Sequence, residues 1–370
     1  HVTYFRGNRI KRDSLRLPTK KKTRKEIAPA AYIRRLRELS ALMDKDCIAI
    51  VPGAQPTIRN GDVEYPFRQD SDFHYLTGFD EPDAVFVLIP GREHGEALLF
   101  CRERDNERER WHGHITGPER AMQFFGMDDA FPVSDIDDIL PGLIEGRSKL
   151  YDAMGVDRDV DNQVIDWVKK ISQSDHLGAE SPGEFVQLDH YLHELRLFKS
   201  AAEIALMKLA ADATVKGHCR IMQKTQPGMM EYELEAELIH EFSINGARHC
   251  SYPAIVGGGA NACVLHYVSN NEVLADGDLV LVDAGGEYEG YACDLTRTFP
   301  VNGRFSESQA RVYEVVLRAQ DAAIAAVRPG NTWNDPHEAA INELSKGLVI
   351  LGVLSGNLDD LISQEAYLLS

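Results

Sequence analysis

The stretch LVLVDAGGEYEGYACDLTRTFP, residues 279–300, contains two apolar runs, and each run carries an aspartate where a core side chain is expected. Asp283 ends the first run, Leu279–Val282, and Asp294 lies within the second. Residues 287–290 between the runs favour a turn, so the stretch predicts a β-hairpin.

The register of this hairpin decides what the two aspartates can do. A loop centred between Tyr288 and Glu289 places Asp283 directly opposite Asp294. Opposed side chains lie about 4.5–5.5 Å apart, and like charges at that separation repel each other. A divalent cation with oxygen ligands would remove the conflict. A shared proton, or two surface aspartates on opposite faces, are the alternatives that the spacing leaves open.

The composition describes a globular protein with room for two domains. Its 370 residues are 44% hydrophobic and 26% charged, as is typical of such proteins. A net charge of −18 argues against nucleic acid as a partner. No apolar run approaches the roughly 20 residues of a membrane span, so we expect no membrane partner. The six scattered cysteines form no C-x-x-C pair, which predicts free thiols in a reducing, cytoplasmic compartment.

The order of apolar and polar segments predicts the domain organisation. Residues 1–28 are rich in lysine and arginine and are predicted to be a disordered extension, with a nucleic-acid or targeting arm as the alternative. Strands and helices alternate over residues 29–175, which predicts an α/β domain. Residues 172–182 are polar and turn-rich, and we place the start of a linker there.

Three further segments lead up to and follow the aspartate hairpin. Residues 263–267 predict a short strand, and residues 307–327 and 332–351 predict two helices. The glycine-rich residues 256–262 lack the lysine of a phosphate-binding loop, so we interpret them as a tight turn.

Two separate motifs resemble the aminopeptidase P family. Residues 64–82, EYPFRQDSDFHYLTGFDEP, closely resemble the N-terminal domain of the bacterial enzymes, and residues 195–204 resemble the entry into their catalytic domain. The triplet Leu265-His266-Tyr267 and the aspartate hairpin resemble the first part of the family's metal site. The likeness runs from about residue 30 to about residue 367.

The resemblance implies a fold class for the whole chain. An aminopeptidase-P-type α/β domain would occupy residues 29–175, and a linker with the entry to the catalytic domain would occupy residues 176–198. Residues 199–370 would form part of an α+β domain with the pita-bread fold.

The resemblance also implies a metallo-aminopeptidase that releases the N-terminal residue from peptides with proline at the second position. Its site would hold two manganese ions, or other divalent metals, with Asp283 on one ion and Asp294 bridging both. A hydroxide between the ions would attack the scissile carbonyl. His266 resembles a histidine that contacts the substrate near the scissile bond, whereas the motif-free interpretation is a hydrogen-bonded histidine at a strand end.

A proline at the second position requires a pocket that accepts its ring. Tyr252, Tyr267 and Trp111 are candidate walls, with ordinary packing as the alternative for each. In this family, an N-terminal-domain tryptophan of a neighbouring subunit can reach the site. The resemblance therefore makes Trp111 worth testing and makes a homo-oligomer an expected partner.

The sequence departs from the family pattern in its last part. The family adds a histidine and two glutamates to the site, but no H-x-x-x-H-x-x-G pattern occurs here. His337 and Glu338 fall in a predicted helix and do not match. Two carboxylates alone hold two metals poorly, so we expect a chain that is truncated relative to the family and weakly active or inactive alone. A non-catalytic peptide-binding or protein-binding module of the same fold and an Xaa-Pro dipeptidase (prolidase) are the alternatives.

Overall fold

The computed structural model describes residues 26–173 and 180–369. The chain divides into two compact units, residues 1–206 and residues 207–370, which are described separately. The predicted extension 1–28 lies almost wholly outside the described residues, as do residues 174–179 at the start of the predicted linker.

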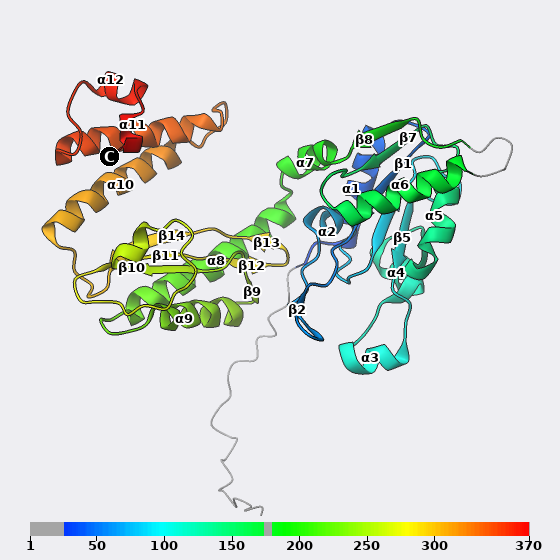
Figure 1. Ribbon diagram of the computed structural model, residues 1–370, viewed down its shortest axis with the longest axis horizontal. Helices are drawn as coiled ribbons and strands as arrows, with labels where there is room; N and C mark the ends of the chain where they lie inside the picture. The colour runs from blue at the N-terminus through cyan, green and yellow to red at the C-terminus, as the bar shows by residue number, and fades with distance from the viewer. Residues whose placement is uncertain (1–25, 174–179, 370) are drawn as a thin grey trace, which may run out of the picture. The chain divides into compact units, whose positions relative to one another are not determined.

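In unit 1, the described residues form a six-stranded mixed sheet with the order β6-β5-β4-β1-β7-β8 (Figure 1). Its strands are β1 (Cys47–Pro52), β4 (Val85–Leu88), β5 (Ala97–Cys101), β6 (Asp129–Pro132), β7 (Lys149–Asp152) and β8 (Glu184–Gln187). Strand β1 pairs antiparallel with β4 and parallel with β7. A small hairpin of β2 (Ile58–Asn60) and β3 (Val63–Glu64) is separate from this sheet.

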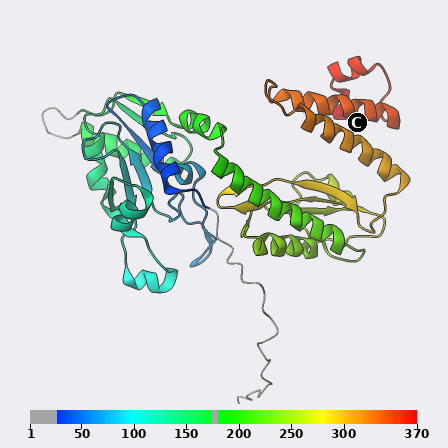
Figure 2. The ribbon, with the colours of Figure 1, turned by 180° about the vertical axis from the view of Figure 1, so that it is seen from behind.

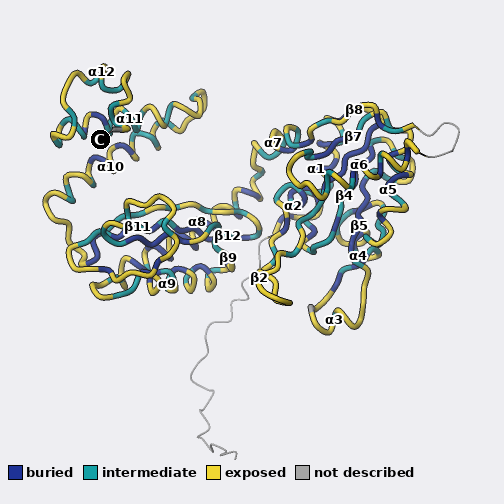
Figure 3. The backbone as a smooth tube through the Cα atoms, viewed as in Figure 1, coloured by how far each residue is buried: buried dark blue, intermediate teal, exposed yellow. Residues whose placement is uncertain are grey.

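Helices cover both faces of this sheet. The helices of unit 1 are α1 (Pro29–Leu42), α2 (Ser71–Thr77), α3 (Asn106–His112), α4 (Gly117–Phe125), η2 (Val133–Asp135), α5 (Ile136–Ile144), α6 (Arg158–Ser172) and α7 (Asp189–Leu197). Alternate residues of β1 enter two separate cores: Ala49 packs with α1, α2 and α7, whereas Ile48 packs with α5 and α6. Burial on both faces explains why β1 is a continuous apolar run, and Figure 3 shows the buried residues along the central strands.

The expected α/β architecture of the N-terminal part is confirmed, but unit 1 extends past the predicted domain end. Strand β8 pairs in parallel with β7, and Leu188 and Leu192 enter the core beside α1. Both β8 and α7 therefore complete unit 1, although they lie within residues 176–198, the predicted linker and entry.

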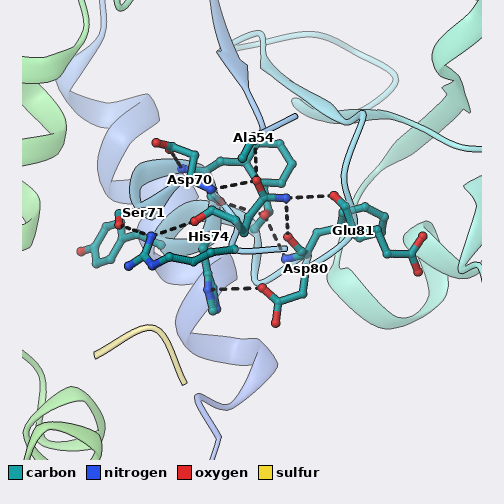
Figure 4. A network of polar contacts seen from close by, with 12 residues as sticks. Ala54, Asp70, Ser71, His74, Asp80 and Glu81 are labelled. Carbon is teal, nitrogen blue, oxygen red and sulfur yellow. Dashed lines mark hydrogen bonds and ion pairs between the residues drawn. The ribbon is translucent and has the colours of Figure 1, made fainter. Parts of the chain in front are cut away.

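The residues of the 64–82 motif form a network of hydrogen bonds around one buried amide (Figure 4). Gln69 Oε1 accepts from the backbone N–H groups of Ala54, at 2.7 Å, and Asp70, at 2.9 Å. Gln69 Nε2 donates to the carbonyls of Phe79, at 3.2 Å, and Glu81, at 2.9 Å. Gln69 thus ties three loop segments together with four hydrogen bonds.

Unit 2 begins within the long helix α8 (Ala201–Lys224). Its next elements are α9 (Glu231–Ile244), β9 (His249–Cys250), β10 (Ile255–Gly258), η3 (Gly259–Cys263), β11 (Leu279–Asp283), β12 (Gly286–Tyr288), β13 (Tyr291–Ala292) and β14 (Thr296–Pro300). The described strands form two small sheets, β10-β11-β14 and β13-β12-β9. Ile221 of α8 and Leu238 of α9 pack against Val256 and Val282 in one core, so these two helices cover one face of the strands (Figure 2).

Unit 2 ends with helices, and the two predicted ones are confirmed. These elements are α10 (Glu307–Ala326), α11 (Asn334–Leu351), α12 (Leu358–Ser363) and η4 (Ala366–Leu369). Helices α10 and α11 approach closely, because a Cβ atom at Gly347 would lie 2.1 Å from Val315 Cγ1. His337 and Glu338 lie in α11, in agreement with the sequence. None of the helices that the structure describes is long and apolar enough to span a membrane.

Candidate metal centre

The aspartate hairpin forms, but its register is two residues away from the predicted one. Tyr288 pairs with Tyr291, and the turn is made by Glu289-Gly290, with φ angles of 51° and 76°. Positive φ at both central residues is typical of a type I′ turn, for which a glycine at the second position is favoured. The glycine in Glu289-Gly290 is the signal that could have set the register.

The corrected register changes the partners of both aspartates. Asp283 pairs with Thr296. Ala284 N donates to Leu295 O at 3.2 Å, and the register then places Gly285 opposite Asp294. The prediction that Asp283 lies directly opposite Asp294 is therefore wrong. A shift of two residues keeps each side chain on its face of a strand, so the two aspartates remain diagonal neighbours on one face.

The two carboxylates meet at a single hydroxyl group. The Tyr252 hydroxyl is hydrogen-bonded to Asp283 Oδ1 and lies 3.0 Å from Asp294 Oδ1. Asp283 is half-buried and Asp294 is exposed. Burial raises the pKa of the Tyr252 phenol, and the two carboxylates raise it further. The phenol therefore stays protonated.

A phenol has one proton to donate, so it cannot neutralise two carboxylates. Hard divalent cations prefer such oxygen ligands, and in kind the pair Asp283 and Asp294 fits one. The pair alone supplies too few ligands to complete a metal site. No third histidine, cysteine, aspartate or glutamate joins Asp283 and Asp294 within residues 26–173 and 180–369. The chain thus brings together two carboxylate ligands of a metal site.

His266 lies in a turn and not in the predicted strand. The chain forms the short 3-10 helix η3, and Val264 N donates to Asn261 O at 3.1 Å as that helix ends. His266 is exposed, and its neighbour Leu265 is 89% exposed. The strand prediction for residues 263–267 is wrong, because Cys263 ends the helical turn η3 and residues 264–267 belong to none of the described strands.

A buried glutamate, Glu231, anchors the segment that carries His266. Its Oε1 accepts from Gly258 N at 2.8 Å and from Asn261 Nδ2 at 3.1 Å. Its Oε2 accepts from the Tyr267 hydroxyl at 2.8 Å and from Glu272 N at 3.0 Å. The carboxylate therefore holds the segment before His266 and the segment after it.

The electrostatics of Glu231 follow from these four bonds. Burial alone would raise the pKa of Glu231, but the donated hydrogen bonds together hold that pKa below its usual value. Glu231 is fully buried and stays ionised. The sequence gives no local sign of this role, because Glu231 is one of several acidic residues at the start of a helix, where acids are common anyway.

The remaining candidates lie in different environments. The half-buried Tyr267 uses its hydroxyl in the Glu231 network, and burial raises the pKa of that hydroxyl. Trp111 lies on α3 of unit 1 and is 81% exposed. Tyr252 contacts the aspartates through its hydroxyl. That each of these rings lines a substrate pocket stays a prediction, as does the role of His266.

Comparisons with known proteins agree over both units. Metallopeptidase family M24 matches residues 205–360, and the aminopeptidase P N-terminal domain matches residues 32–151. An Xaa-Pro aminopeptidase from Escherichia coli is 41% identical over 92% of this chain and 78% of its own length. One from Haemophilus influenzae is 43% identical over 84% of this chain and 69% of its own length.

Solved structures give the same result. The aminopeptidase PepP of Pseudomonas aeruginosa superposes with a TM-score of 0.91 at 52% identity, covering 93% of this chain and 78% of the other. A zinc-substituted aminopeptidase P from E. coli in complex with product superposes with a TM-score of 0.89 at 41% identity, covering 92% of this chain and 78% of the other.

Proposed function

We propose that this chain, which belongs to the aminopeptidase P (Xaa-Pro aminopeptidase) members of metallopeptidase family M24, releases the N-terminal residue from peptides with proline at the second position. The observation that carries the proposal is the convergence of Asp283 and Asp294 on the Tyr252 hydroxyl. Two carboxylates facing one proton donor form a ligand pair for a cation, in a chain 41% identical to an Xaa-Pro aminopeptidase.

Asp283 and Asp294 would hold the divalent metal, and we propose Mn²⁺ because both ligands are hard carboxylate oxygens. When bound, such an ion supplies an activated water near neutral pH and polarises the scissile carbonyl. The Tyr252 hydroxyl orients the Asp283 carboxylate by donating to Oδ1. This hydrogen bond fixes the direction of the free lone pairs.

His266 is proposed to contact the peptide near the scissile bond. Its position in an exposed turn supports this role, because the imidazole is accessible to a substrate. Glu231 supports it indirectly, because it holds the backbone on both sides of that turn. Tyr252, Tyr267 and Trp111 remain the proposed walls of the proline pocket, with Trp111 acting in a homo-oligomer.

The six cysteines are free thiols, which supports a reducing compartment. We therefore propose a cytoplasmic location.

The test is hydrolysis of a tripeptide with proline in second place by the purified chain, compared with the same peptide carrying alanine there. Because only two carboxylates converge within the described residues, we expect slow turnover that needs a large excess of Mn²⁺. Asp283→Asn should lower kcat/KM by about 100-fold or more, since it removes a metal ligand. Asp321→Asn, at an exposed position of α10, is the matched control.

Other outcomes distinguish the alternatives. Faster hydrolysis of an Xaa-Pro dipeptide than of the tripeptide would indicate a dipeptidase. Peptide binding that survives a chelator, without any hydrolysis at saturating Mn²⁺, would indicate a non-catalytic binding module. Equal turnover by the wild type and Asp283→Asn would overturn the proposed role of the aspartate.

A further inference from the structure

Two buried side chains of α8 bond the backbone of the aspartate hairpin. Thr214 and His218 lie four residues apart and therefore on one face of the helix. Thr214 Oγ1 accepts from Gly286 N at 2.9 Å, and His218 Nε2 lies 2.9 Å from the carbonyl oxygen of Ala284. Thr214 is fully buried and His218 is 2% exposed.

The chemistry of each contact is fixed by its partners. The Thr214 hydroxyl donates its proton to Ala210 O at 2.9 Å, so a lone pair faces Gly286 N. A carbonyl oxygen can only accept, so His218 Nε2 carries the hydrogen that bonds Ala284. His218 Nδ1 is buried without a partner, and burial lowers the pKa of the imidazole. His218 is thus a neutral side chain that uses one N–H.

These two contacts flank Gly285, the residue opposite Asp294. A Cβ atom at Gly285 would lie 1.7 Å from the carbonyl oxygen of Cys293, so the two strands are in close contact here. Cys293 N also donates to Gly286 O at 3.2 Å, so the residue held by Thr214 pairs directly with the neighbour of Asp294. Movement of Ala284 or Gly286 would therefore change the separation of Asp283 and Asp294.

We propose that Thr214 and His218 are positioning residues that set the separation of Asp283 and Asp294. The inference deepens the proposed function and rests on it for the metal. Side chains that orient the ligands of a metal site commonly change its affinity by about 10- to 100-fold when they are replaced. Thr214 and His218 bond only backbone atoms of α8 and the hairpin, so they would act through the backbone that carries the aspartates.

Two pairs of variants separate the hydrogen bonds from packing. Thr214→Val removes the hydroxyl at nearly constant volume, whereas Thr214→Ser keeps it. His218→Asn has no donor at the position of Nε2, whereas His218→Gln can place one there. Thr225→Val is the matched control, because the Thr225 hydroxyl makes the same type of bond to the carbonyl four residues before it, Ile221 O at 2.7 Å.

The first measurement is the apparent Kd for Mn²⁺ alone, followed by electron paramagnetic resonance. Thr214→Val and His218→Asn should raise it by about 10- to 100-fold. Thr214→Ser, which keeps the acceptor, and His218→Gln, which keeps the donor, should have an apparent Kd near that of the wild type. Thr225→Val should also have a Kd near that value. The second measurement, on metal-free protein, is the ¹³C chemical shift of the Asp283 and Asp294 carboxyl carbons. This chemical shift should change in Thr214→Val and His218→Asn but not in the other variants.

Unchanged carboxyl shifts in both Thr214→Val and His218→Asn would overturn the inference. A second outcome is that the carboxyl shifts change in these variants while the wild-type protein binds no Mn²⁺. It would uphold the positioning role of Thr214 and His218 and overturn the metal role of the proposed function. If Thr214→Val does not fold, the comparison of His218→Asn with His218→Gln decides, with the unfolding midpoint of each variant measured alongside.

Discussion

Two buried side chains, one in each unit, hold loops in place with four hydrogen bonds each. Gln69 of unit 1 accepts two bonds and donates two, so its neutral amide matches a mixed set of partners. Glu231 of unit 2 accepts all four, and its partners are all donors. The same geometric task is therefore performed by an uncharged group in one unit and by a charged group in the other.

The difference shows how the partners decide the chemistry of the central group. Carbonyls and N–H groups together require an amide, whereas four donors require a carboxylate. A charge-assisted network is stronger than a neutral one but depends on pH. The Glu231 network holds the turn of His266, so the segment with a proposed catalytic residue carries the pH-sensitive anchor.

Removal of the Glu231 side chain should have the largest effect. Glu231→Ala leaves four donors without their acceptor, and we expect it to lower the free energy of unfolding of unit 2 by about 3–5 kcal/mol. Hydrogen exchange in residues 256–273, followed by mass spectrometry, should increase. Glu233→Ala is the control, since Glu233 accepts one exposed backbone bond from Met230. Similar effects of the two variants would contradict the special role of Glu231.

The reciprocal substitution in unit 1 tests whether the amide is needed there. Gln69→Glu replaces a donor by a carboxylate oxygen that faces the carbonyls of Phe79 and Glu81. We expect a loss of about 2–4 kcal/mol at pH 7, measured by denaturant unfolding with the buried Trp167 as fluorophore. A variant as stable as the wild type would show that these carbonyls do not require a donor.

Glu231→Gln should cost less, about 1–3 kcal/mol, because the amide keeps one acceptor. It should also remove a pH dependence. The pKa of Glu231 is lowered on folding, so its stabilisation is present above the unfolded pKa and is lost as pH falls through the folded pKa. Exchange in residues 256–273 should therefore rise on acidification below about pH 4.5 in the wild type only. A parallel rise in Glu231→Gln would assign the effect to another group.

Asp152 of unit 1 should show the opposite pH dependence. Burial raises the pKa of Asp152 to about 6, and its Oδ2 atom has no hydrogen-bond partner. A raised folded pKa gives stability that is present below the unfolded pKa and is lost as pH rises through about 6. Asp152→Asn should stabilise unit 1 by about 1–2 kcal/mol at pH 8 relative to the wild type, and by little near pH 4.

Denaturant unfolding of Asp152→Asn and the wild type at both pH values measures this difference. Ser134→Ala, an exposed polar position of the same unit, is the control. A constant difference between pH 4 and pH 8 would contradict titration of Asp152.

The sequence predicted those parts of the fold that depend on the local apolar pattern. Strand β1 reads as a buried run because both of its faces are covered, and α10 and α11 follow the helical period. The hairpin was predicted from its two runs, but the predicted register was wrong, because the turn depends on the left-handed φ of Glu289. A single non-glycine residue in that conformation is difficult to foresee.

The anchors of the site depend on contacts between distant residues. Glu231 lies 27, 36 and 41 positions before Gly258, Tyr267 and Glu272, and no local pattern links it to them. Thr214 lies 72 positions before Gly286 in the sequence. Sequence periodicity placed Asp283 and Asp294 on one ribbon, whereas the residues that hold this ribbon emerge only from the packing of α8.

Gly285 has no side chain and takes no part in a reaction. The space at this position nevertheless admits no other amino acid, because any Cβ atom would overlap the carbonyl oxygen of Cys293. Selection on the hairpin should therefore preserve this glycine as strictly as it preserves a reactive group. If homologues all have glycine at position 285, the reason would be the close spacing of the two strands and not contact with a peptide.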